Sequence, residues 1–141
     1  MVDFSLISDT YDRINQYLVE TPLLESPFLS DRLNKRVLIK AECLQKTGSF
    51  KYRGSWSSFV NNDIEDLKKG VLAYSSGNHA QGIAAVANQL KIQATIIMPK
   101  DAPRLKIKNT QSYGANVIFY DRVEESREEI GEKLQKEKNL K

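Results

Sequence analysis

From Gly70 onward the sequence alternates short apolar runs with helix-like segments, and this rhythm constrains the fold more than any other feature. The apolar runs begin near residues 71, 94 and 116, a spacing of 22 to 23 residues. Apolar residues at helical spacing lie between them. The predicted elements are strands at 71–75, 94–98 and 116–120 and helices at 79–90, 104–113 and 123–138. This order is typical of strand–helix–strand units and predicts an α/β fold whose parallel sheet is covered on both faces.

The first seventy residues follow a weaker pattern. They predict a helix over 6–18, a short helix over 28–33, a strand over 37–41, a polar loop over 45–49 and a helix over 51–60. Thr21–Pro22 must be extended or turning, because proline disfavours helix at the residue before it. The pattern breaks at Asn61–Gly70, which indicates a boundary. The chain stops at 139–141, where the alternation of strands and helices predicts another strand, and this hints at truncation.

Length and composition exclude several classes of protein. The 141 residues, 40% of them hydrophobic, suit one folded domain, and a net charge of +3 is too small to indicate a nucleic-acid partner. The longest uncharged apolar stretch, Ala94–Pro99, is far shorter than the ~20 residues of a membrane span, and no signal peptide is evident. The single cysteine, Cys43, leaves no internal disulfide or multi-cysteine zinc site. We therefore expect a soluble cytoplasmic protein with no metal, membrane or nucleic-acid ligand.

Four basic residues lie close together in the second half of the chain. They are Lys100, Arg104, Lys106 and Lys108. Their spacing suits a solvated helix face, and no aromatic residue is interleaved with them. A phosphate-binding patch is the alternative interpretation.

Thr47–Gly54 is the first segment that could carry chemistry. This polar loop places Lys51 at the start of a predicted helix, where the helix dipole already contributes positive charge. A positive charge is unfavourable at that end of a helix, so the presence of a lysine there needs an explanation other than helix stability. One reason is catalysis, because a partly desolvated amine near positive charge can act as a nucleophile or base. The alternative is an ordinary exposed lysine.

Ser75–Gly82 is the second such segment, and it runs from the carboxyl end of a strand into a helix. Ligands of open parallel sheets bind outside the carboxyl ends of strands, and free N–H groups at a helix N-terminus attract anions. Ser75, Ser76 and Asn78 add polar side chains at this point. The simpler interpretation is that Ser76 or Asn78 caps the helix. His79 is the only histidine, and we expect it to have a positioning or packing role and not to act as a general base.

Together the two segments resemble the pyridoxal-phosphate-dependent threonine/serine dehydratases, which have the tryptophan-synthase-β-like fold (fold type II). The further matches are Thr21-Pro22-Leu23, Lys40-Ala41-Glu42, Met98-Pro99, Asp101-Ala102-Pro103 and Gly114-Ala115. The resemblance implies open parallel sheets with flanking helices. Residues 1–65 would be the N-terminal part of the large cofactor domain, and residues 70–141 would form a small, three-layer α/β domain.

The resemblance also implies roles for individual residues. Lys51 would hold pyridoxal 5'-phosphate as a Schiff base and then act on the substrate α-proton, and Ser76 would be a second acid–base group. Phe50 would pack beside the cofactor ring and Asn78 would hydrogen-bond its 3-hydroxyl. The substrate carboxylate would be held by the turn residues Ser75, Ser76, Gly77, Asn78 and His79. The implied reaction converts L-threonine or L-serine to a 2-keto acid and ammonia.

These enzymes are more than twice as long as this chain, and their glycine-rich phosphate loop would lie beyond its last residue. We therefore expect an N-terminal fragment that is inactive alone, with an exposed sheet edge and an uncovered apolar face. The full-length protein would form a homo-oligomer. Two alternatives stay open: a serine-racemase-type enzyme, and a non-catalytic fragment that binds an anion or an amino acid.

Overall fold

The structure, a computed structural model, describes residues 3–138 and 140. Its centre is a parallel sheet with the strand order β3-β4-β5. The strands are β3 (Val71–Tyr74), β4 (Ala94–Pro99) and β5 (Asn116–Tyr120), and they are connected by α5 (Asn78–Leu90) and α6 (Arg104–Ser112). Ile96 of β4 pairs with Ala73 on one side and with Val117 on the other. The parallel sheet that the rhythm predicts is therefore present.

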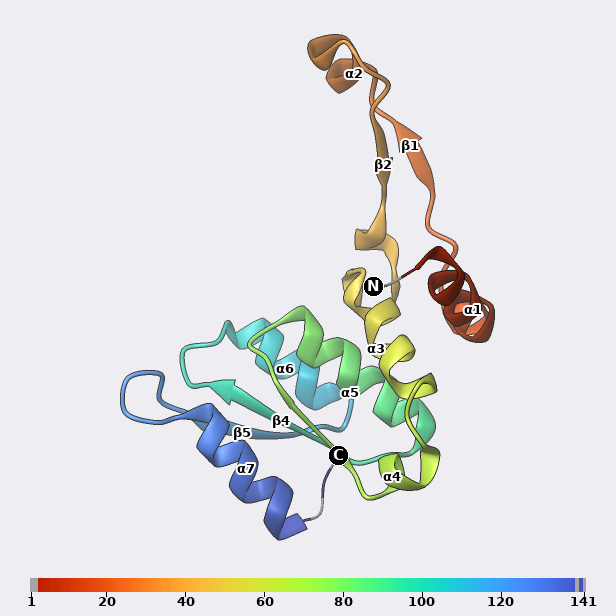
Figure 1. Ribbon diagram of the computed structural model, residues 1–141. Helices are drawn as coiled ribbons and strands as arrows, with labels where there is room; N and C mark the ends of the chain where they lie inside the picture. The colour runs from red at the N-terminus through yellow and green to blue at the C-terminus, as the bar shows by residue number, and fades with distance from the viewer. Residues whose placement is uncertain (1–2, 139, 141) are drawn as a thin grey trace.

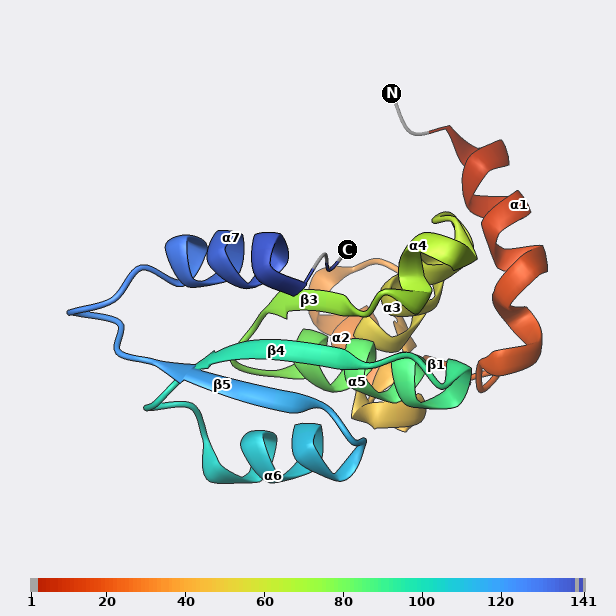
Figure 2. The same cartoon turned by 90° about the horizontal axis from the view of Figure 1, so that it is seen from below.

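Helices cover both faces of this sheet (Figure 2). Helices α5 and α6 lie on one face and α7 (Arg127–Lys138) lies on the other. Every residue of the central strand β4 is buried, because it has neighbours on both edges and both faces. Within residues 3–138 and 140, no helix has the length and apolar content that a bilayer span requires.

Helix α7 begins four residues later than the sequence predicts. The Asp121 carboxylate accepts a hydrogen bond from the Val123 N–H, and the resulting turn keeps the segment after β5 out of helical geometry. The helix starts only after Ser126, whose hydroxyl accepts from the Glu129 N–H. Positions 139 and 141, where the sequence rhythm stops, lie outside the described residues.

The N-terminal part is an extended arm that stands away from the sheet (Figure 1). Its elements are α1 (Phe4–Ile14), a 3-10 turn (Asn15–Tyr17), β1 (Leu23–Glu25), α2 (Pro27–Leu33) and β2 (Leu38–Lys40). Strand β1 pairs with β2 in antiparallel orientation, with Leu24 opposite Ile39. The sequence predicts β2, which lies in the apolar run 37–41, but not β1, whose three residues directly follow Thr21–Pro22. Both strands are exposed along their length, which agrees with the uncovered apolar face that we expect.

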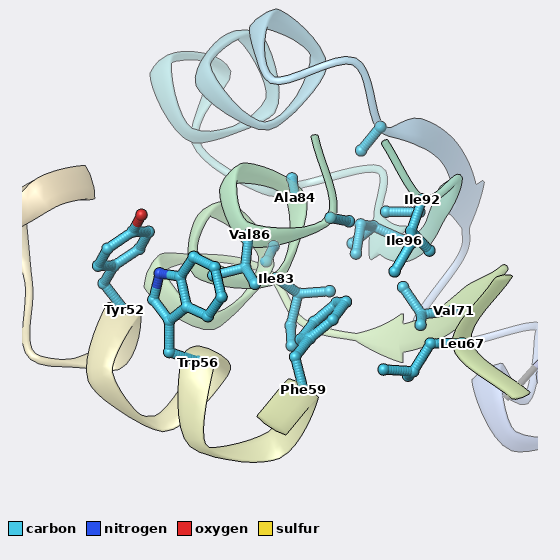
Figure 3. Close-up of a cluster of buried hydrophobic side chains, with 14 of the residues drawn as sticks. Tyr52, Trp56, Phe59, Leu67, Val71, Ile83, Ala84, Val86, Ile92 and Ile96 are labelled. Carbon is cyan, nitrogen blue, oxygen red and sulfur yellow. The ribbon is translucent and has the colours of Figure 1, made fainter. Parts of the chain in front are cut away.

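Helix α3 (Lys51–Val60) packs against α5 and joins the arm to the sheet. Tyr52, Trp56 and Phe59 project from α3 toward Ile83 and Val86 of α5 (Figure 3). Two 3-10 turns, Glu42–Leu44 and Lys46–Gly48, precede α3, and α4 (Ile64–Lys68) follows it. The sequence does not predict α4. One buried core includes residues from both sides of the break at Asn61–Gly70, so the division of the chain there stays a prediction.

Candidate functional site

The turn between β3 and α5 presents free hydrogen-bond donors at the carboxyl edge of the sheet. The Ser75 hydroxyl accepts from the N–H groups of Gly77 and Ala80, each at 3.2 Å, and the Ser75 N–H donates to the Ile97 carbonyl of β4. Among the described residues, the N–H groups of Asn78 and His79 have no hydrogen-bond partner. The first turn of α5 therefore offers two donors and a positive helix end to an anion.

The residue that caps this turn differs from the simpler interpretation of the sequence. The N-cap position is Gly77, which makes no side-chain capping bond. The Ser75 hydroxyl accepts from the Ala80 N–H instead, whereas the simpler interpretation of the sequence has Ser76 or Asn78 as the cap. Within the described part of the chain, the side chains of Ser76 and Asn78 make no hydrogen bond. Local sequence cannot choose among several neighbouring polar residues, because the choice depends on how β3 enters the turn. The structure thus leaves Ser76 and Asn78 available to a ligand.

Lys51 is the first residue of α3, and its ammonium group has no counter-ion in the described part of the chain. The first turn of α3 contains no acidic residue. The Nζ atom of Lys51 lies 5.1 Å from the centre of the Phe50 ring, and Phe50 is 58% exposed. The side chain of Lys51 is itself exposed, as in the alternative of an ordinary exposed lysine, and the partial desolvation of the catalytic interpretation is not found.

A close contact between α3 and α5 brings the two segments together. A methyl group built on Gly82 of α5 would lie 3.2 Å from the carbonyl oxygen of Lys51. The first turns of the two helices therefore lie side by side. The pKa of His79 is lowered from its ordinary 6.5, first by partial burial of its ring and then by the charge of Lys51. At neutral pH the imidazole is thus uncharged and has a positively charged neighbour.

An ion pair connects the arm to α3 two residues after Lys51. The Arg53 guanidinium donates two hydrogen bonds of 2.8 Å to the Glu42 carboxylate, and the Thr21 hydroxyl donates to the same carboxylate at 2.5 Å. The bonds from Arg53 lower the pKa of Glu42. In the sequence, Thr21 and Glu42 are noted only as members of short segments that match the dehydratase family. No local signal reveals the network, because its hydrogen-bonded pairs are 11 and 21 residues apart.

The structure places at the site one residue, Lys106, that the sequence does not assign to it. Lys106 belongs to the basic cluster that the sequence assigns to a solvated helix face, but its side chain reaches the Ser75–His79 turn. A methyl group built on Gly77 would lie 2.9 Å from Lys106 Nζ. The sequence could not show this approach, because Gly77 lies between β3 and α5 whereas Lys106 lies in α6, which follows the next strand.

Comparison with known proteins adds family evidence to this geometry. The family model described as pyridoxal-phosphate dependent enzyme matches residues 14–140. L-threo-3-hydroxyaspartate ammonia-lyase of Saccharomyces cerevisiae is 46% identical over 128 residues, which cover 91% of this chain and 39% of that protein.

Two solved structures extend the likeness to the fold. Maize serine racemase superposes with a TM-score of 0.91 at 37% identity, over 99% of this chain and 42% of that one. The processed form of threonine deaminase isoform 2 from Solanum lycopersicum superposes with a TM-score of 0.82 at 33% identity, over 98% of this chain and 40% of that one. The chain thus spans about two fifths of the length of the relatives that it matches.

Proposed function

This chain belongs to the pyridoxal-phosphate dependent enzymes, and from that premise we propose that the whole protein is an ammonia-lyase that converts L-threonine or L-serine to a 2-keto acid and ammonia. The activity is proposed for the whole protein because the chain spans about two fifths of its relatives. A small amino acid is the proposed substrate. The cytoplasmic location and the homo-oligomer stay predictions.

The described residues fit the part of the cofactor that reacts. Pyridoxal phosphate supplies an aldehyde that bonds to amines and an electron sink that stabilises negative charge at the substrate Cα. Lys51 offers an exposed amine without a carboxylate partner among the described residues, and Phe50 offers an exposed aromatic ring beside it. Lys51 would hold the aldehyde, Phe50 would pack beside the ring and Asn78 would hydrogen-bond the ring hydroxyl. The seven glycines are too scattered to form a phosphate loop within this chain.

The turn before α5 is the proposed carboxylate site. The free N–H groups of Asn78 and His79 lie at the helix N-terminus, where an anion is favoured. The side chains of Ser75 and Asn78, together with the uncharged ring of His79, complete a polar surface around Gly77. This surface would bind the substrate through its carboxylate and so orient its Cα–H bond.

Proton transfer is the chemical work that this chain's own residues would do. Lys51, once its amine is released to act as a base, would take the proton from the substrate Cα. Ser76 is the proposed second acid–base group, because its hydroxyl lies in the same turn and has no partner among the described residues. The observation that carries the proposal is the juxtaposition of the unpaired Lys51 ammonium with the unpaired donors of α5.

Covalent trapping tests this proposal. The protein is incubated with pyridoxal phosphate and reduced with borohydride, and mass spectrometry then locates the modified lysine. We expect the modification on Lys51 and its loss in Lys51→Ala. Lys108→Ala is the control, because Lys108 is an exposed lysine elsewhere on the surface. Modification spread evenly over the surface lysines, or unchanged in Lys51→Ala, would contradict the proposal.

A second candidate substrate is L-threo-3-hydroxyaspartate. One supporting observation is the 46% identity to L-threo-3-hydroxyaspartate ammonia-lyase. The other is that the ammonium groups of Lys51 and Lys106 have no counter-ion among the described residues. A substrate with two carboxylates would bring a second negative charge to this surface. Ammonia release from threonine, serine and hydroxyaspartate by the whole protein would rank the three. Formation of D-serine would instead indicate the racemase alternative.

A further inference from the structure

Lys106 is held at the candidate carboxylate site by the packing of α6 on α5. The Asn109 side-chain amide of α6 donates to the Gln81 side-chain oxygen of α5 at 3.1 Å, and Gln81 is buried. The fully buried Thr110 hydroxyl donates to the Lys106 carbonyl at 2.8 Å. The Asn109–Gln81 bond joins the second turn of α6 to the first turn of α5, whereas the Thr110–Lys106 bond lies within α6. Lys106 is therefore placed by the fold and is half-buried, unlike a lysine on a solvated helix face.

Gly77 leaves the space that the Lys106 side chain occupies. A methyl group at Gly77 would lie 2.9 Å from Nζ, 3.4 Å from Cδ and 3.7 Å from Cε of Lys106. The first of these distances is closer than non-bonded atoms allow. The φ of Gly77 is −160°, an extended value that any residue can adopt, so this angle alone does not require glycine here. A methyl group here would meet only the flexible end of the Lys106 side chain and would displace it from its place beside the turn.

The ammonium of Lys106 has no counter-ion in the described part of the chain. Its cluster neighbour Lys100 lies 3.7 Å from the Glu125 carboxylate and 4.0 Å from that of Asp121. The first turn of α6, in contrast, contains no acidic residue. An unpaired, half-buried cation therefore lies beside the unpaired N–H groups of α5. Both features lower the free energy of an anion in the same place.

We propose that Lys106 is a positioning residue for the substrate carboxylate: its ammonium, admitted by the missing side chain of Gly77, strengthens the binding of a carboxylate to the Ser75–His79 turn. This inference rests on the proposed function, which assigns that turn to the substrate. It goes further in two ways. It explains why position 77 has no side chain, and it adds the positive charge of Lys106, from α6, to the donors of α5. Of the basic cluster, the inference uses only Lys106, and it assigns a carboxylate as the ligand where the sequence offers phosphate as an alternative.

Malonate binding, followed by NMR at constant ionic strength, tests the inference without the cofactor. The amide signals of Asn78 and His79 report the binding. We expect Lys106→Met to weaken malonate binding about three- to tenfold, because one charge is removed near the anion. Lys106→Arg, which keeps the charge, should bind within about twofold of the original protein. Lys108→Met is the matched control from the exposed side of the same helix, and should also bind within about twofold.

A double-mutant cycle tests the link between Gly77 and Lys106. Gly77→Ala alone should weaken malonate binding, because the methyl group displaces the flexible end of the lysine. In the Lys106→Met background the same change should add little. If Lys106→Met fails to fold, Lys106→Gln takes its place in the cycle, because Gly77 lies in the turn and its substitution alone cannot isolate the effect of the ammonium.

Three results would overturn the inference. Unchanged malonate affinity in Lys106→Met would reject the role of Lys106 while leaving the turn as a carboxylate site. Fully additive effects of the two substitutions would reject the link with Gly77. If malonate does not shift the Asn78 and His79 signals even in the original protein, both this inference and the proposed carboxylate site fail.

Discussion

Gly82 of α5 faces Ser55 of α3 so closely that a methyl group on Gly82 would lie 2.5 Å from Ser55 Oγ. The Ser55 hydroxyl is fully buried and donates to the Lys51 carbonyl at 3.0 Å. The two helices therefore approach each other at the turn that begins with Lys51. This contact brings the Lys51 segment alongside the first turns of α5, which carry the proposed carboxylate site.

Gly82→Ala should destabilise the protein by separating α3 from α5. Overpacking of a tight core contact costs about 1–3 kcal/mol, and urea unfolding measures it. Gly54→Ala is the matched control, because Gly54 lies on the exposed side of α3 and a methyl group there would meet nothing within 4 Å. The control should raise the free energy of unfolding by about 0.5–1 kcal/mol, since alanine favours helix over glycine. Equal effects of the two substitutions would contradict the close contact.

The pKa of His79 should rise toward its ordinary 6.5 when Lys51 is replaced by methionine. The charge of Lys51 is the second cause of the lowered pKa, after partial burial, so the rise is incomplete. Because His79 is the only histidine, its ring signals in an NMR pH titration are unambiguous. Lys108→Met should leave this pKa unchanged. An unaltered pKa in Lys51→Met would mean that the two side chains are farther apart than the structure shows.

The lowered pKa of His79 also predicts how stability depends on pH. The unfolded chain binds a proton to His79 more readily than the folded chain does. The free energy of unfolding should therefore fall as the pH drops through 6.5 toward the lower, folded-state pKa. His79→Gln should remove this part of the pH dependence. A comparison of urea unfolding at about pH 7.5 and at about pH 5.5 measures the difference.

Glu42→Gln should weaken the attachment of the arm to α3. The Glu42 and Arg53 side chains are only 17% and 26% exposed, and we expect a loss of about 1–3 kcal/mol in thermal or urea unfolding. Glu25→Gln is the control: its partner is Arg36, both are far more exposed at 47% and 73%, and the loss should stay under about 1 kcal/mol. Similar losses at the two sites would show that burial does not distinguish the pairs.

The Glu42–Arg53 pair should also contribute to acid sensitivity. Hydrogen bonds from Arg53 lower the pKa of Glu42 from 4.5, so the stabilisation is present above pH 4.5 and is lost as the pH falls through the folded-state pKa. Glu42→Gln should flatten this part of an acid unfolding curve followed by circular dichroism. An acid transition of unchanged steepness in the variant would assign the sensitivity to other carboxylates.

Gly131→Ala should loosen α7 from the sheet. A methyl group at Gly131 would overlap the ring and hydroxyl of Tyr74 on β3. The expected cost is about 1–3 kcal/mol in urea unfolding. In a Tyr74→Ala background the overlap disappears, and the same change should stabilise the protein by up to about 1 kcal/mol through helix propensity. The same sign of effect in both backgrounds would refute the contact.

Much of the fold can be predicted because its elements leave periodic traces in the sequence. Strands β3, β4 and β5 appear as continuous apolar runs, and α5 has apolar residues at helical spacing. Elements that depend on a distant partner or a short cap escape prediction: β1 exists only through pairing with β2, and α4 is a five-residue helix capped by Asp63. The predicted start of α7 is too early, because the side-chain hydrogen bond of Asp121 has no periodicity.

The primary structure by itself determined the alternation of strands and helices, the two polar segments, and therefore the candidates Lys51 and Ser75–His79, because hydrophobic periodicity and turn chemistry are local properties. Only the tertiary structure decided that the Ser75 hydroxyl bonds to the first turn of α5, that Gly82 lets α3 approach α5, and that Lys106 lies at Gly77. The physical reason is packing. Which side chain fills the space left by a glycine depends on helices that are far apart along the chain and adjacent only after folding.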